Sequence, residues 1–97
     1  MQARFKLGEP LARAVGVRQT SVEVPVPPSG VVTVGDALNA LLAAYPQAAY
    51  ELRLGANDSD FYYTLFVNDR LVLFANRDKT PLHDGDVISV FLPLAGG

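Results

Sequence analysis

The chain has 97 residues, with eight basic and ten acidic side chains and a formal net charge of −2. This length allows one domain, and the absence of a basic run argues against binding to nucleic acid. Apolar residues make up 49% of the sequence, yet no apolar stretch approaches the roughly 18 residues of a membrane span. The chain has no cysteine, which excludes disulfides, thiolate metal ligands and thiol nucleophiles. Its first residues lack the apolar core of a signal peptide, so we expect a cytoplasmic protein.

Two strands are predicted in the first part of the chain. Residues 4–7 alternate polar and apolar side chains, and so do residues 20–26, whose valines share one face. Pro25 and the prolines that follow it rule out a central strand beyond this point. Between the two strands, residues 11–16 suit a short helical turn that Gly16 ends.

Residues 33–46, TVGDALNALLAAYP, give the clearest helix signal. Apolar side chains recur at the i, i+3, i+4 and i+7 positions of one helix face. Thr33 suits the N-cap, and Asp36, three residues later, completes a capping-box pair. Pro46 stands where a helix must end. The opposite face is mostly alanine and asparagine, so one side of this helix should be packed.

The second half of the chain predicts three more strands. Residues 62–68 and 70–74 lie on either side of an Asn-Asp turn signal, and residues 87–92 form the last strand after a turn at 80–86. Residues 52–60, rich in Gly, Asn, Asp and Ser, are predicted to form a loop.

One helix among about five strands cannot cover the parallel sheet of a Rossmann fold, which needs several crossover helices. The simplest packing is an α+β domain with one mixed sheet and the main helix on one face. The first and last strands are then parallel neighbours in the centre, and the other strands lie toward the edges. This arrangement is the β-grasp, or ubiquitin-like, fold.

The sequence ends in a short, uncharged tail that directly follows the last predicted strand. Glycine has no Cβ and adopts positive and negative φ with similar ease, so a two-glycine tip can thread a narrow passage in another enzyme. The reactive group that this implies is the terminal carboxylate of Gly97. A glycine pair arises by chance too often to carry weight alone. The predicted flexible tail comprises Pro93, Leu94, Ala95, Gly96 and Gly97.

A docking surface is predicted on the side of the sheet away from the helix. Ile88 and Val90 have the parity of core residues, so Phe91 should point to the other face. An exposed aromatic side chain beside a reactive tail favours contact with a partner, unless a loop covers it. Further candidates for partner contact are Leu92, Phe66 and Phe74.

No catalytic or metal centre is indicated on this chain. His83 is the only histidine, and it stands in a polar turn. With no second histidine and no cysteine, the chain cannot build a typical metal site or a nucleophile–base pair. The closely spaced aspartates at 58 and 60 and at 84 and 86 lack the distal glutamate of a calcium loop and fit turn chemistry.

Four segments carry a pattern that spans nearly the whole chain. They are Thr33-Val34-Gly35-Asp36, Val67-Asn68-Asp69, Pro81-Leu82-His83-Asp84-Gly85-Asp86 and Phe91-Leu92-Pro93-Leu94-Ala95-Gly96-Gly97. Together they resemble the ubiquitin-like sulfur carriers, such as the small subunit of molybdopterin synthase and the thiamine sulfur carriers. The group often has Pro-Pro where this chain has Leu92-Pro93, and Leu-Arg-Glu where it has Leu11-Ala12-Arg13.

The resemblance implies that residues 1–97 form one sulfur-carrier domain without a bound cofactor. A ubiquitin-activating-type enzyme would use ATP to adenylate Gly97, and a sulfur donor would convert the adenylate to a thiocarboxylate. The acceptor would be a precursor pterin held by the molybdopterin synthase large subunit. The chain would then be a non-catalytic carrier subunit of that synthase complex.

Three alternatives remain open from the sequence. The carrier could supply sulfur for thiamine, cysteine or tRNA thiolation. Gly97 could instead be joined to a lysine of a target protein, as in a ubiquitin-like modifier. Finally, the chain could be a plain β-grasp binding module in which the terminal glycines have no role.

Overall fold

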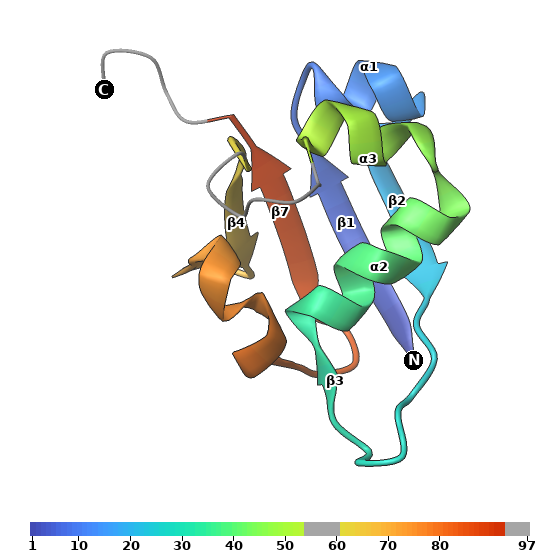
Figure 1. The fold of residues 1–97 in the computed structure, drawn as a ribbon, viewed down its shortest axis with the longest axis vertical. Coiled ribbons are helices and arrows are strands. Elements are labelled where there is room, and N and C mark those ends of the chain that lie inside the picture. The colour runs from blue at the N-terminus through green and yellow to red at the C-terminus, as the bar shows by residue number, and fades with distance from the viewer. Residues whose placement is uncertain (54–60, 93–97) are drawn as a thin grey trace.

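A computed structural model describes residues 1–53 and 61–92 of the chain. Its main sheet has five strands in the order β2-β1-β7-β4-β5 (Figure 1). β1 and β7 pair in parallel at the centre, and the other neighbours pair antiparallel. This topology confirms the predicted β-grasp fold. The strand bounds are β1 (Gln2–Leu7), β2 (Gln19–Glu23), β4 (Thr64–Val67), β5 (Arg70–Val72) and β7 (Val87–Phe91).

The hydrophobic core lies between the sheet and helix α2 (Val34–Ala44), which crosses one face of the sheet (Figure 1). Every second residue of the central strands is buried, among them Phe5 of β1 and Ile88 and Val90 of β7. This alternation follows from the two-residue repeat of a strand. The helix contributes the apolar stripe that its spacing predicts, with Val34, Ala37, Leu38 and Leu41 buried.

The start of α2 confirms the predicted capping box. The Asp36 amide donates to the Thr33 hydroxyl over 3.2 Å, and the Thr33 amide donates to the Asp36 carboxylate over 3.0 Å. These two bonds satisfy backbone donors that the first helical turn leaves without an intrahelical partner. Consequently the helix begins at a defined residue and its apolar stripe meets the sheet in one register.

Within residues 1–53 and 61–92, four short elements are present that the sequence did not predict. Helix α3 (Gln47–Leu52) follows Pro46 and buries Ala48 and Leu52. At six residues it is too short to show a helical repeat. The two-residue strands β3 and β6 pair with each other, and a 3-10 helix follows β5. Their bounds are β3 (Val32–Thr33), β6 (Pro81–Leu82) and η2 (Phe74–Lys79).

The 3-10 helix corrects one predicted strand. The alternation of residues 70–74 predicted a strand through Phe74, but β5 ends at Val72 and η2 begins at Phe74. Two other predicted strands are shorter than expected: the strand predicted over residues 20–26 ends at Glu23, and the one predicted over residues 62–68 covers only Thr64–Val67. Part of the predicted loop at 52–60 lies outside the described residues. The helices that the structure describes reach at most 11 residues, and none could span a bilayer.

Two turns are tied together at one end of β7. Asn68 adopts a left-handed conformation (φ 55°), and its side chain donates to the Asp86 carboxylate (3.1 Å) and accepts from the Val87 amide (3.1 Å). The amide of His83 donates to the other oxygen of Asp86 over 3.0 Å. These donors, above all the His83 amide, lower the pKa of Asp86. The two turn motifs therefore form a single polar clamp, which fixes where β7 starts.

We expect Asn68→Ala to destabilise the fold by about 1–2 kcal/mol, because it removes two side-chain hydrogen bonds and places alanine at a positive φ. Chemical denaturation monitored by circular dichroism measures the change. Asp69→Ala, at the neighbouring exposed position, is the matched control and should have a smaller effect. Equal stability of the Asn68 variant and the parent would show that the clamp contributes nothing.

Candidate functional site

The sheet surface opposite α2, here called the open face, carries an apolar cluster of Phe66, Leu71 and Phe91. Phe66 is on β4, which lies between β5 and β7, and it is in register with Leu71 on β5 and with Ser89 on β7. Phe91 occupies the next position of the same face on β7, diagonal to Phe66 and within reach of it. Leu71 is 60% exposed and Phe91 is 39% exposed. Phe91 therefore points outward, as the alternation of side chains along β7 predicts.

The ring of Phe91 rests directly on Gly8, the residue that follows β1. A Cβ added at Gly8 would lie 2.4 Å from Cδ1 of Phe91, which is much closer than two carbon atoms can approach. The Gly8 amide also donates to the Val90 carbonyl over 2.8 Å and extends the pairing of β1 with β7. Gly8 therefore leaves the space in which the last residue of β7 is held.

Basic side chains border the apolar cluster along β1. Arg4 pairs in register with Val87, and Lys6 with Ser89, so both lie on the open face beside β7. Both are exposed. Arg18, beside the end of β1, forms an ion pair of 3.5 Å with Glu9, so the positive charge of this margin comes mainly from Arg4 and Lys6. The open face thus combines an apolar centre with a positive margin, a surface suited to a partner with an apolar centre and acidic residues around it.

The remaining predicted contact residues, Leu92 and Phe74, occupy different surroundings. Leu92 follows β7 and packs, half-buried, against the core. Phe74 stacks on Phe61, with ring centroids 3.9 Å apart and an interplanar angle of 5°, and the Arg77 guanidinium lies 4.0 Å from its ring centre. The structure therefore groups Phe74 with η2 and not with the open-face cluster of Phe66, Leu71 and Phe91.

Four residues of this site escaped the sequence analysis, namely Leu71, Gly8 and the basic residues Arg4 and Lys6. Leu71 could have been found, because the Asn-Asp turn sets it opposite Phe66 if the two strands form a hairpin. Gly8 could not, since its contact with Phe91 joins positions far apart in the sequence.

The predicted reactive tail lies outside the described residues. This applies to Pro93, Leu94, Ala95, Gly96 and Gly97. In the described part of the chain, no three His, Asp or Glu side chains gather into a potential metal site. His83 lies 3.7 Å from Asp86 within the turn clamp, in agreement with its predicted place in a turn.

Comparison with known proteins gives consistent matches over almost the entire chain. Residues 14–97 match the ThiS family. Small archaeal modifier protein 1 of Haloferax volcanii is 34% identical over 97 residues, which covers 96% of this chain and 98% of that protein. The crystal structure of SAMP1 from Haloferax volcanii superposes with a TM-score of 0.73 at 30% identity and covers all of both chains.

A more distant structure has the same fold. It is the complex of subunits 1 and 2 of the molybdopterin-converting factor from Helicobacter pylori, whose matching chain gives a TM-score of 0.59 at 22% identity, with both chains fully covered. At this identity the likeness concerns the fold alone.

The contact between Gly8 and Phe91 can be tested by crowding it. We expect Gly8→Ala to destabilise the fold by about 1–3 kcal/mol, because the new methyl group displaces the Phe91 ring. The double variant Gly8→Ala/Phe91→Ala should recover part of this loss, since no ring then meets the methyl group. Thermal unfolding of the four proteins of this cycle measures the coupling. Strictly additive effects would show that the two residues do not interact.

Proposed function

We infer a carrier function, because the chain belongs to the ThiS family of ubiquitin-like sulfur carriers. We propose that a ubiquitin-activating-type enzyme adenylates the carboxylate of Gly97 with ATP and releases pyrophosphate. A sulfur donor then displaces AMP, so that one carboxylate oxygen is replaced by sulfur and a thiocarboxylate forms. The sulfur is passed on to an acceptor, and the carboxylate is regenerated. We expect this cycle to run in the cytoplasm.

The single observation that supports this proposal most is the position of β7. This strand lies in the centre of the sheet, and its last residue, Phe91, belongs to the open-face cluster. The tail begins at position 93 of the sequence, two residues later. A partner that binds the cluster and its basic margin therefore holds the start of the tail at a fixed place. Such positioning raises the effective concentration of the terminal carboxylate at the partner's active site.

The chain itself supplies no catalytic group in this scheme. The described residues show no assembled metal site, and the only histidine belongs to a turn. The adenylating enzyme must provide the ATP site, and the sulfur acceptor must provide its own catalytic residues. This division of roles fits a domain whose contribution is a reactive terminus and a docking surface.

We propose the molybdopterin synthase large subunit as the sulfur acceptor, with this chain as the small subunit. Two features support this choice: the sequence motifs that resemble the small subunit, and a fold shared with a chain of the Helicobacter pylori complex of subunits 1 and 2. The same chemistry would also serve an acceptor in thiamine, cysteine or tRNA thiolation.

A second candidate function is conjugation to proteins. The 34% identity to a protein named Small archaeal modifier protein 1 favours it. In this case a lysine amine attacks the activated Gly97 carbonyl, AMP leaves, and an isopeptide bond forms. Both functions share the adenylation step and differ only in the nucleophile that follows it.

Incubation with the adenylating enzyme, ATP and a sulfide donor tests the proposal. We expect intact mass spectrometry to show a gain equal to one sulfur minus one oxygen. Deletion of Gly97 should abolish this gain and leave the melting temperature unchanged, because it changes none of the buried core residues that the structure describes. The same reaction without the sulfide donor is the control.

Each further outcome has a defined meaning. A lysine-linked product in cell extract would favour the modifier function. No mass change with an adenylating enzyme that modifies a related carrier would leave only the binding module. Unfolding of the deletion variant would show that the tail is structural.

The docking surface is tested by truncating its aromatic residues. We expect Phe91→Ala or Phe66→Ala to weaken binding to the adenylating enzyme or the large subunit at least about tenfold, since buried aromatic anchors dominate interfaces. Isothermal titration calorimetry measures this affinity. Tyr50→Ala, which removes a 90% exposed aromatic side chain from α3, is the matched control. Unchanged affinity in both phenylalanine variants would rule out the open face as the docking surface.

A further inference from the structure

One edge of the sheet presents hydrogen-bonding groups that face away from the rest of the sheet. β2 is the outermost strand on this side and pairs with β1. The Val24 amide donates to the Met1 carbonyl (2.7 Å), and the Leu7 amide donates to the Arg18 carbonyl (2.8 Å). Because hydrogen-bonded and non-hydrogen-bonded pairs alternate in an antiparallel ladder, the residues between these positions can be assigned. Backbone groups point away from β1 at Gln19, Ser21 and Glu23.

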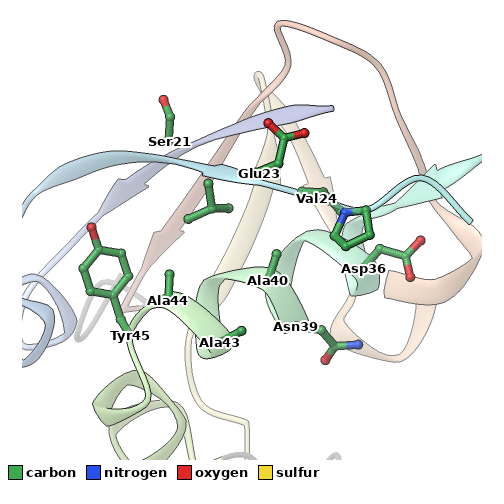
Figure 2. A pocket seen from close by; sticks show the side chains of 11 residues that line it. Ser21, Glu23, Val24, Asp36, Asn39, Ala40, Ala43, Ala44 and Tyr45 are labelled. Carbon is green, nitrogen blue, oxygen red and sulfur yellow. The ribbon is translucent and has the colours of Figure 1, made fainter.

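A groove of about 700 Å³ runs between this edge and α2 (Figure 2). The helix lines it with short side chains, including Ala40, Ala43 and Ala44. Tyr45 stands at one end, where its hydroxyl forms a hydrogen bond of 2.9 Å with Thr20. The bond ties the end of the helix to the strand, so the two walls of the groove are held at a fixed separation.

The width of the groove comes from the size of the helix side chains. An exposed helix face normally carries long charged residues, but Asp36 is the only charged residue of α2. Alanine at positions 40, 43 and 44 leaves room beside β2 that lysine or glutamate side chains would fill. In Figure 2 the side chains of Ser21 and Glu23 point away from α2, so the strand offers its backbone to the groove.

The lining of the groove is acidic at one end. Asp36 stands at the end opposite Tyr45 (Figure 2), and Glu23 lies on the strand near it. Lysine and arginine are absent from the lining residues that the structure describes. Glu23 lies 2.7 Å from the ammonium group of Met1, so Asp36 contributes most of the negative charge. A ligand with a basic residue at this end complements the site.

We propose that this groove binds an extended peptide segment of a partner protein, which adds a strand to β2. The peptide's backbone would pair with the outward groups of Gln19, Ser21 and Glu23, as in other cases of strand addition to an exposed edge. Every second side chain would be small and apolar and would fill the space over Ala40 and Ala43. A lysine or arginine would lie beside Asp36. This site is separate from the open face, and the proposal goes beyond the carrier function.

The occupant is a peptide and not a second copy of the chain. The side chains of β2 that face the helix, Val22 and Val24, are already buried in the core of their own domain. A second β2 strand placed at the edge would therefore bring no free side chain to fill the groove. A peptide strand of about five residues is as long as the five-residue strand β2, and the side chains on one of its faces are free to enter the groove.

Selection from a phage library of random peptides of about eight residues tests the proposal. We expect the enriched peptides to alternate small apolar residues with polar ones and to carry a terminal lysine or arginine. Amide shifts in nitrogen-15 NMR spectra should change at Ser21 and Ala43 when a selected peptide is added. Fluorescence anisotropy with the same labelled peptide gives the affinity.

Two variants should weaken this binding at least about tenfold. Ser21→Pro removes a backbone donor that points outward, so the pairing with β1 is kept. Ala43→Arg fills the groove from the exposed side of the helix. The controls are Ser21→Ala, which keeps the backbone donor, and Gln47→Arg, which adds the same charge on α3. Asp36→Asn should weaken only peptides with a basic end, because the asparagine side-chain oxygen can still accept the hydrogen bond from the Thr33 amide.

Three outcomes would overturn the proposal. The first is that no peptide is enriched, and the second is that the selected peptides bind both groove variants as tightly as the parent. The third is a self-associating parent that Ser21→Pro converts to a monomer in sedimentation velocity, which would assign the edge to a second copy. Formation of the thiocarboxylate on the Ser21→Pro variant separates this site from the carrier function, since we expect that reaction to proceed unchanged.

Discussion

The parallel pairing of β1 with β7 is the constraint on which the rest of the structure depends. It joins the beginning of the chain to its last strand, with Phe5 in register with Ile88 and Leu7 with Val90. All four side chains are buried beneath the helix layer. Because side chains alternate along a strand, burying these four commits Phe91 to the opposite face. The open face is thus a consequence of the core, and no separate device is needed to expose its aromatic residue.

Each end of β7 is held by a different contact. At its start, the Asn68 side chain bonds to both Asp86 and Val87. At its end, the Phe91 ring lies against Gly8, and the Gly8 amide bonds to Val90. The strand is therefore fixed along its whole length, and the position from which the tail departs is fixed with it. Because the proposed reaction occurs at the chain terminus, a partner on the open face meets the end of β7 at a defined position.

The sequence predicts the parts of this fold that rest on local signals. The apolar repeat of residues 33–46 and the Thr33–Asp36 pair specify α2, and the two-residue alternation specifies the face of Phe91. Helix α3 is too short to show a repeat, and η2 occupies a segment whose alternation mimics a strand. The contact of Gly8 with Phe91 and the groove beside β2 depend on residues brought together only by the sheet order. No spacing within the sequence reports such contacts.

The domain has two separate surfaces on one sheet, the open face and the groove beside β2. The open-face cluster lies over β4, β5 and β7, whereas the groove lies at the far edge, beyond β1. An activating enzyme that binds the first surface would not compete directly for β2. The alanines of α2 are the physical reason why the second surface exists, because longer side chains would close the groove without disturbing the core. Replacing them therefore changes peptide binding while the buried stripe of Val34, Leu38 and Leu41 keeps the fold intact.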